Sequence, residues 1–202
     1  MKNNKFKAIG FDHTGVIAGD SARLFHEKVC HVLQIEYPEF RKVYQNHNLD
    51  FNAGRITKKE FWTTILRELK KETFYYEVME VVDAPRLLNN SVMQLIYDLK
   101  EKGYKLGILS NDTVEGGVVI RKDEGLEDIF DLILISAETG LAKPTVEAFT
   151  DFAEKLGVTF DELVFIDDAI FNIEAADKLG ITTVKCDDPN NLRNQLEDLE
   201  VL

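Results

Sequence analysis

Cysteine is scarce in this chain, and long apolar runs are absent from it. The 202 residues include two cysteines, Cys30 and Cys186, which lie far apart and have no paired spacing. The sequence therefore predicts neither a disulfide framework nor a zinc site. No apolar run approaches the roughly 20 residues that span a membrane, and residues 1–5 lack the apolar stretch of a signal peptide. We therefore expect a cytoplasmic protein with no membrane partner.

Basic residues are also fewer than acidic residues. The chain has 24 lysines and arginines against 36 aspartates and glutamates, which gives a formal net charge of −12 at pH 7. Such a surface repels the phosphate backbone of nucleic acid, so we expect no nucleic-acid partner. Hydrophobic residues make up 45% of the chain and charged residues 30%, as in ordinary globular proteins. At this length the chain can form one substantial core with a small accessory module.

Five short apolar segments have the length and composition of buried strands. They are residues 6–11, 105–109, 132–135, 163–166 and 182–185. Helical patterns separate the last four segments, and two of these patterns, 145–156 and 172–179, are each followed by a glycine. The alternation of strand and helix favours parallel pairing through right-handed crossovers. A terminal amphipathic helix is expected over 189–199.

The segment from Ala18 to about Lys102 departs from this alternation, because it shows helical periodicity alone. We expect a helix capped by Asp20 or Ser21, a second that opens with the capping box Thr57–Glu60, and a third that opens with the capping box Ser91–Gln94. The third helix is assigned to the core. We therefore predict an α/β fold, with a Rossmann-like doubly wound parallel sheet core (1–17 and 86–202) and an inserted small α-helical cap (18–85).

Polar side chains follow four of the predicted strands or begin the helix after them. They are Asp12, the pair Ser110-Asn111, Lys143, and the pair Asp167-Asp168. In an open parallel sheet, reactive groups gather where the strands end at their carboxyl side. The sequence therefore predicts that these side chains form one site.

The ordered set of motifs resembles that of the haloacid dehalogenase superfamily. The matching segments are Phe11-Asp12-His13-Thr14-Gly15-Val16-Ile17, Ile108-Leu109-Ser110-Asn111, Gly140-Leu141-Ala142-Lys143-Pro144, and Phe165-Ile166-Asp167-Asp168 with Asn172. Residues 53–62 of the insert also resemble the cap of small phosphatases that are related to the N-terminal domain of soluble epoxide hydrolases.

The resemblance implies a phosphatase that acts on a small phosphorylated metabolite, for which a sugar phosphate is one candidate. Asp12 would attack phosphorus and form an aspartyl-phosphate, while Lys143 neutralises the nucleophile and the transferring group. Ser110 and the backbone N–H of Asn111 would hold phosphate oxygens.

The resemblance also implies a Mg²⁺ cofactor, because an anionic nucleophile has to approach an anionic phosphoryl group. Its ligands would be Asp12, the backbone carbonyl of Thr14, and Asp168, with Asp167 binding through water or orienting a neighbour. Asn172 follows Asp168 by one helical turn and can support the acidic pair.

Thr14 departs from the family pattern, which places a second aspartate there as general acid and base. A threonine hydroxyl cannot exchange protons usefully near neutral pH. Three outcomes remain open: a slower phosphatase, a proton shuttle supplied by His13 or the cap, and a regulatory protein that binds a phosphorylated ligand without turnover. A metal-free 2-haloacid dehalogenase is disfavoured, because its site would gain nothing from the acidic pair Asp167-Asp168. The substrate and the oligomeric state are left open.

Overall fold

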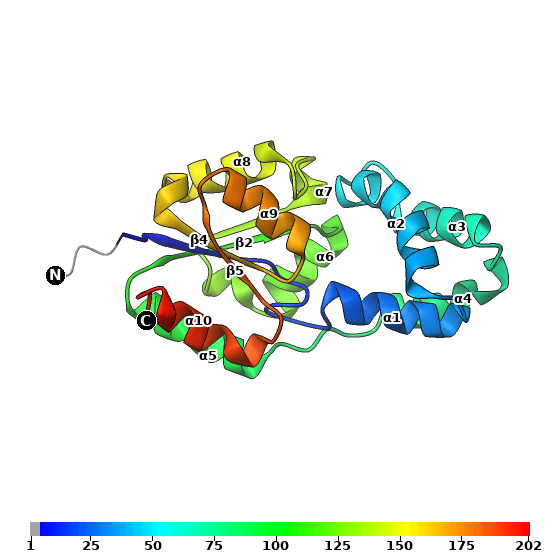
Figure 1. Cartoon of the computed structure of the whole chain (residues 1–202), viewed down its shortest axis with the longest axis horizontal. Coiled ribbons are helices and arrows are strands. Elements are labelled where there is room, and N and C mark those ends of the chain that lie inside the picture. Colours follow the sequence, from blue (N-terminus) through cyan, green and yellow to red (C-terminus); the bar gives the residue numbers. More distant parts are fainter. Residues whose placement is uncertain (1–4) are drawn as a thin grey trace.

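Residues 5–202 of the chain are described by a computed structural model, whose centre is a parallel sheet of five strands (Figure 1). The strands are β1 (Ala8–Phe11), β2 (Lys105–Ser110), β3 (Leu132–Ile135), β4 (Leu163–Asp167) and β5 (Thr182–Lys185). Their spatial order is β3-β2-β1-β4-β5, and every neighbouring pair is parallel. The predicted α/β fold with a parallel sheet is therefore confirmed.

Helices cover both faces of the sheet, because alternate side chains of each strand point to opposite sides. On one face, Ile9 and Phe11 of β1 pack with helices α5 (Asn90–Glu101) and α10 (Leu192–Asp198). On the other face, Ala8 of β1 packs with α8 (Val146–Leu156) and is in the same cluster as residues of α9 (Ile170–Lys178). Figure 1 shows the two helical layers on either side of the strands.

Two glycines allow α8 to approach the sheet closely. Gly10 of β1 and Gly107 of β2 are paired neighbours in the sheet. A Cβ atom at either position would lie 2.6 Å from a ring atom of Phe152. The Phe152 ring thus packs directly on the strand backbone, next to the strand ends that carry the polar motifs.

The expected ends of three core elements need correction. Asn89, not Ser91, caps α5, because its side chain accepts hydrogen bonds from the backbone N–H groups of Ser91 and Val92. Helix α9 begins at Ile170, two residues before the expected start. The terminal segment begins as a short 3-10 helix, Pro189–Asn191, before α10.

Shorter helical segments connect the core elements. They are α6 (Val114–Val118), a π-helical turn η2 (Val119–Asp123), η3 (Leu126–Asp128), α7 (Ser136–Thr139) and η4 (Phe160–Glu162). The π-helical turn carries the chain from α6 toward Glu124, whose side chain contacts the loop after β1.

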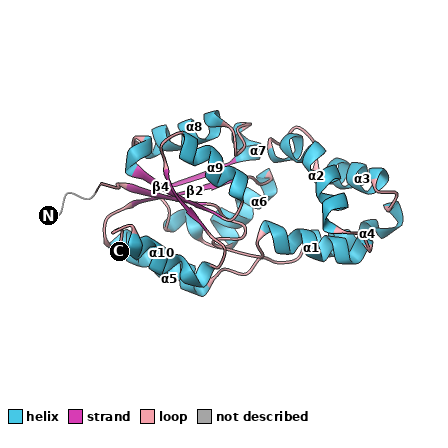
Figure 2. Cartoon of the chain, viewed as in Figure 1, coloured by secondary structure: helices cyan, strands magenta, loops and turns pink. Residues whose placement is uncertain are grey.

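The insert consists of helices with their own hydrophobic cluster, and Figure 2 shows no strand in it. Its helices are α1 (Ala22–Leu33), α2 (Tyr37–Asn52), α3 (Lys58–Glu68), η1 (Glu72–Phe74) and α4 (Tyr75–Val82). The cluster is rich in aromatic rings: Phe40 stacks on Trp62 and Phe51 on Phe61, with ring centroids 6.4 and 4.4 Å apart. Ser21 caps α1, and Thr57 forms the expected capping box with Glu60.

The two chain segments that join the insert to the core lie side by side. The backbone N–H of Gly19 donates to Leu87 O (3.0 Å), and that of Asn89 donates to Ile17 O (2.8 Å). The insert touches the core a second time at Gly54, where a Cβ atom would lie 2.9 Å from Ala137 Cα. The insert therefore lies beyond the carboxyl ends of the strands (Figure 1). The predicted boundaries at 17/18 and 85/86 stay a prediction.

Within residues 5–202, none of the helices combines the length and the apolar character needed to cross a membrane.

Candidate active site

The sheet register places Asp12 beside the ends of two neighbouring strands. Phe11, the last residue of β1, pairs with Ile108 of β2 and with Ile166 of β4. The backbone N–H of Asp12 then donates to Ile166 O at 2.8 Å. Because β1 is the central strand, the chain direction alone brings Asp12 next to Asp167 and close to Ser110, which ends β2.

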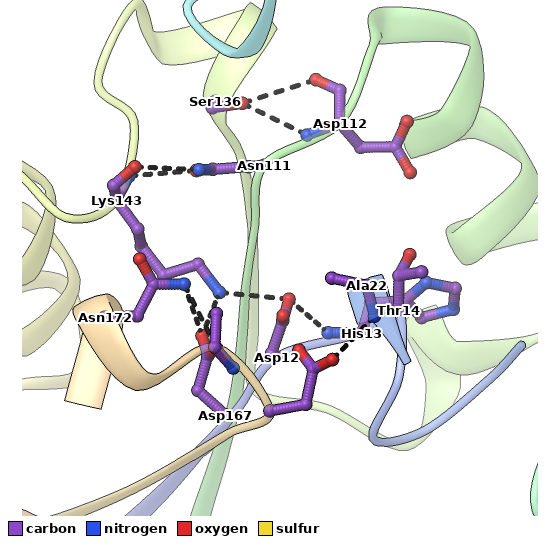
Figure 3. A network of polar contacts seen from close by, with 12 residues as sticks. Asp12, His13, Thr14, Ala22, Asn111, Asp112, Ser136, Lys143, Asp167 and Asn172 are labelled. Atoms are coloured by element: carbon purple, nitrogen blue, oxygen red, sulfur yellow. Dashed lines mark hydrogen bonds and ion pairs between the residues drawn. The ribbon is translucent and has the colours of Figure 1, made fainter. Parts of the chain in front are cut away.

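Lys143 joins this group from the segment that precedes α8. Asn111 positions the Lys143 backbone through both ends of its side-chain amide: Nδ2 donates to Lys143 O (2.8 Å), and Oδ1 accepts from Lys143 N–H (2.9 Å). The Lys143 ammonium lies 3.0 Å from Asp12 Oδ1 and 2.6 Å from Asp167 Oδ2. Figure 3 marks both contacts with dashed lines. The Lys143 side chain is 1% exposed, so this buried cation is shared by two carboxylates.

Asp167 is saturated by protein hydrogen bonds. Its Oδ1 accepts from the backbone N–H of Ala169 (2.8 Å), and Asn172 Nδ2 lies 3.0 Å from Oδ1 and 2.9 Å from Oδ2. Together with Lys143, these contacts hold both oxygens of Asp167. Asn172 therefore acts on Asp167, five residues before it, rather than on Asp168.

Asp168 has a more open environment than Asp167. Its Oδ2 accepts from the backbone N–H of Ala22 (2.7 Å), the first residue of α1. Gly15 lies beside the same carboxylate, because a Cβ atom there would be 2.7 Å from Asp168 Oδ2. Gly15 has a φ of +88°, so its conformation and this close approach both favour glycine.

The three aspartates form a crowded group of negative charges. Asp12, Asp167 and Asp168 each offer a carboxylate oxygen, and these oxygens lie within 4.8 Å of one another. Burial, reinforced by the charges of the other two aspartates, raises the pKa of Asp12 to about 8 despite Lys143. Burial also raises the pKa of Asp168 to about 6, against the effect of the Ala22 hydrogen bond. A hard divalent cation with oxygen ligands would relieve this repulsion, so the donor set fits Mg²⁺.

Lys143 itself stays protonated in this environment. Burial lowers the pKa of its ammonium, but the charges of Asp12 and Asp167 outweigh burial, and the pKa of Lys143 is raised. A permanent positive charge beside Asp12 can stabilise an anionic group that binds next to this carboxylate.

The other predicted site residues lie in the same region with different partners. Ser110 is buried at the end of β2. The backbone N–H of His13 donates to Asp12 Oδ1 (2.7 Å), whereas the buried His13 ring is paired through Nε2 with Glu124 Oε2 (2.7 Å). The hydroxyl oxygen of Thr14 accepts a hydrogen bond from Arg86 (2.8 Å).

Sequence reasoning missed three residues of this region. Glu124 contacts His13 in the loop after β1, and Arg86 joins Thr14 of that loop to Asp112 of the loop after β2. Asp112 directly follows the pair Ser110-Asn111, and this adjacency was an available signal. Arg86 and Glu124 lie in irregular segments without a motif, so the sequence offered no signal for them.

Comparison with known proteins identifies a family. The family model of haloacid dehalogenase-like hydrolases matches residues 6–180. A glyceraldehyde 3-phosphate phosphatase from Methanopyrus kandleri is 30% identical over 54% of this chain and 45% of its own length. The chain therefore spans about half the length of that relative. A phosphatase from Mycobacterium tuberculosis is 29% identical, with 93% of this chain and 90% of the relative covered.

Solved structures share the whole architecture. A predicted hydrolase of the same family from Porphyromonas gingivalis superposes with a TM-score of 0.70 at 22% identity, covering 97% of this chain and 98% of that one. A family enzyme from Bacteroides thetaiotaomicron, in complex with magnesium and inorganic phosphate, has a TM-score of 0.66 at 25% identity, covering 93% of this chain and 98% of that one.

Proposed function

The chain belongs to the haloacid dehalogenase-like hydrolases, and we propose that it is a magnesium-dependent phosphatase that forms an aspartyl-phosphate on Asp12. The observation that carries this proposal is the buried ammonium of Lys143, 3.0 Å from Asp12 Oδ1 and 2.6 Å from Asp167 Oδ2. The names of the relatives support the same reaction, because two of them are phosphatases.

Two contacts position the carboxylate of Asp12. Within residues 5–202, the Lys143 ammonium and the His13 N–H both contact Oδ1. These contacts hold the Asp12 carboxylate in place for attack on phosphorus. The P–O bond to the leaving group breaks as the new bond forms, and water later cleaves the aspartyl-phosphate to release phosphate.

Mg²⁺ would be held by Asp12, Asp168 and the backbone carbonyl of Thr14, and it would neutralise charge between the carboxylate and the phosphoryl group. Asp167 has a different part in this proposal. Both of its oxygens are already hydrogen-bonded, so it holds Lys143 in place and acts on the phosphoryl group through that residue. Ser110 and the Asn111 N–H would bind phosphate oxygens.

Small phosphorylated metabolites are the proposed substrates. The net charge of −12 opposes binding of a polyanionic nucleic acid. A cytoplasmic location belongs to the same proposal, because Cys30 and Cys186 are both free thiols, as in reducing compartments.

A second candidate function is binding of a phosphorylated ligand without turnover. It is favoured by Thr14, whose hydroxyl cannot serve as general acid or base near neutral pH and accepts a hydrogen bond from Arg86. The leaving group and the attacking water then have no carboxylate at this position to exchange protons with.

The deciding experiment measures phosphate release from a panel of phosphorylated metabolites with and without Mg²⁺. We expect turnover that chelation of the metal abolishes and that Asp12→Asn eliminates. Asp187→Asn is the matched control, because Asp187 is an exposed aspartate paired with a lysine at the surface. Ligand binding to the unaltered protein without phosphate release would instead establish the second candidate. Equal activity in the Asp12→Asn variant would refute the proposed nucleophile.

Thr14→Asp tests the proton-transfer step separately. A rise in kcat of about tenfold or more would show that proton transfer limits the reaction. An unchanged kcat would show that another step is slower.

A further inference from the structure

Arg86 connects the insert to both loops of the candidate active site. It lies in the segment between α4 and α5, and its Nη1 donates to Thr14 Oγ1 (2.8 Å) and to Asp112 Oδ2 (2.6 Å). Thr14 is two residues after Asp12, and Asp112 is two residues after Ser110. The aliphatic part of Arg86 packs over Gly19, where a Cβ atom would lie 3.3 Å from Arg86 Cγ. The guanidinium is therefore fixed near the tips of both loops.

The positive charge of Arg86 is surrounded by acidic side chains. Burial lowers the pKa of its guanidinium, but Asp112, Glu124 and Asp12 outweigh burial and raise it. Lys143 is 1% exposed and is enclosed between two carboxylates. Arg86, in contrast, is 36% exposed, so its positive charge is accessible to a ligand that enters from the insert side.

The guanidinium also retains donors for a ligand. Both contacts in residues 5–202 involve Nη1, which leaves the Nε and Nη2 N–H groups without an acceptor in this part of the chain. These two nitrogens form the planar edge that binds a carboxylate or a phosphate through two parallel hydrogen bonds. The contacts to Thr14 and Asp112 hold this edge in one orientation, so little rotamer entropy is lost on binding.

The direction of the proposed reaction places the leaving group on the same side. In an in-line displacement the leaving group departs opposite to the nucleophile. Asp12 lies at the end of β1, and the insert lies beyond the strand ends (Figure 1). The leaving group therefore points from the sheet toward the insert, which is the side from which Arg86 reaches the loops.

We propose that Arg86 is a specificity-determining residue that binds an anionic substituent of the leaving group, so that the preferred substrates are phosphate esters of hydroxy acids. This proposal rests on the proposed phosphatase function and deepens it. The carboxylate of the substrate takes no part in bond breaking. It contacts the free edge of Arg86 and fixes the ester in line with Asp12.

A purely structural role is the competing explanation, because Arg86 also joins the two loops. The two roles differ in selectivity. Loss of a structural contact would lower kcat/KM for all substrates by a similar factor. Loss of a recognition contact would lower kcat/KM mainly for the carboxylate-bearing substrate, and chiefly through KM.

Three phosphate esters with the same carbon skeleton separate these roles. Glycerol 3-phosphate, glyceraldehyde 3-phosphate and 3-phosphoglycerate differ only in whether the far carbon is an alcohol, an aldehyde or a carboxylate. We expect kcat/KM of the unaltered enzyme to be about tenfold or more higher for 3-phosphoglycerate than for glycerol 3-phosphate. Arg86→Gln should reduce that ratio by about tenfold or more, and Arg86→Lys should give an intermediate ratio because it keeps the charge but loses the planar edge.

Arg193→Gln is the matched control, because Arg193 is also paired with one aspartate but lies on α10, outside the site. It should leave the ratio unchanged. The melting temperature of each variant is measured alongside, and Arg86→Lys keeps the test valid if Arg86→Gln does not fold.

The possible results distinguish this inference from the proposed function. Hydrolysis without preference for 3-phosphoglycerate, or an equal loss for all three esters in Arg86→Gln, would overturn the role of Arg86 and leave the phosphatase proposal intact. Hydrolysis of p-nitrophenyl phosphate but of none of the three esters would also overturn the role of Arg86 and leave the phosphatase proposal intact. No hydrolysis of any phosphate ester would overturn both proposals.

Discussion

The core and the insert use charged side chains in opposite ways. At the strand ends, Asp12 and Asp167 are buried, and both contact the buried ammonium of Lys143. In the insert, the charged pairs are largely exposed and the interior is formed by aliphatic and aromatic side chains. Exposed pairs of the insert and its N-terminal linker include Arg23–Glu27, Lys28–Asp20, Arg55–Asp50 and Lys58–Asp83.

This contrast separates residues that serve chemistry from residues that serve stability. Burying ions is costly, and a buried ion pair often stabilises a protein less than apolar residues would. The core keeps such a cluster because the proposed reaction needs a desolvated nucleophile beside a fixed cation. The insert holds its shape by apolar burial, and its surface pairs contribute little. Substitutions in the two regions should therefore fail in different ways.

Lys143→Met should give the largest effect, because it removes the cation shared by Asp12 and Asp167. We expect kcat to fall by about a thousandfold. We also expect the free energy of unfolding to fall by about 3–5 kcal/mol, since two buried carboxylates lose their partner. Phosphate-release kinetics and urea unfolding measure the two quantities. Lys155→Met is the control, because Lys155 forms an exposed pair with Asp151. A Lys143→Met variant with normal stability would show that the cluster is not held by this cation.

Phe40→Ala should destabilise the insert while sparing the sheet. Phe40 is fully buried between the rings of Trp62 and Tyr44. Loss of a buried phenylalanine costs about 3–5 kcal/mol. Hydrogen exchange should therefore accelerate in α1–α4 and remain slow in β1, β2 and β4. Equal acceleration in the sheet would show that the two regions unfold as one unit and would remove the contrast between them.

The sequence was sufficient for the parts of the fold that repeat a periodic pattern. The five strands were found at nearly their observed positions, because each is a short apolar segment bounded by polar residues. The convergence of Asp12 and Asp167 is expected from the rule that parallel strands end at one edge of the sheet, whereas Lys143 reaches them from the segment before α8. Their chemical roles remain proposals.

The partners of these residues could not be predicted, because they depend on irregular segments. Glu124, which pairs with His13, is 111 residues away in sequence and follows a π-helical turn. Arg86 lies in a linker without periodicity. The cap of α5 was misassigned because both Asn89 and Ser91 are good capping residues. The helix begins at Asn90, so Asn89 occupies the cap position.

Thr57→Ala should have a smaller effect on stability than Phe40→Ala, because it removes a single helix cap in the insert. Thr57 caps α3, and its side chain accepts a hydrogen bond from Glu60 N–H. Loss of such a cap costs about 1 kcal/mol, so we expect a modest loss of stability with kcat unchanged. Thermal unfolding and phosphate-release assays measure the two effects. Lys59→Ala, an exposed change in the same turn, should alter neither quantity. A large fall in kcat for Thr57→Ala would show that α3 takes part in the reaction.

His26 should give the smallest effect at neutral pH, because its contribution is a pH dependence confined to the insert. Burial, with the nearby charges of Arg41 and Arg23, lowers the pKa of His26 to about 4, and its ring lies against Phe40 and Tyr44. The unfolded chain, with the ordinary pKa of 6.5, binds the proton more readily, so stability of the insert falls as pH drops from about 6.5 toward 4. Hydrogen exchange in α1 and α2 at pH 7 and pH 5 measures this loss of stability. The variant His26→Phe should remove the loss. The control His31→Gln, an exposed change on α1, should leave it in place. Because the ring is already surrounded by aromatic side chains, the phenylalanine fits the site, and an undiminished pH dependence in that variant would show that His26 is not its source.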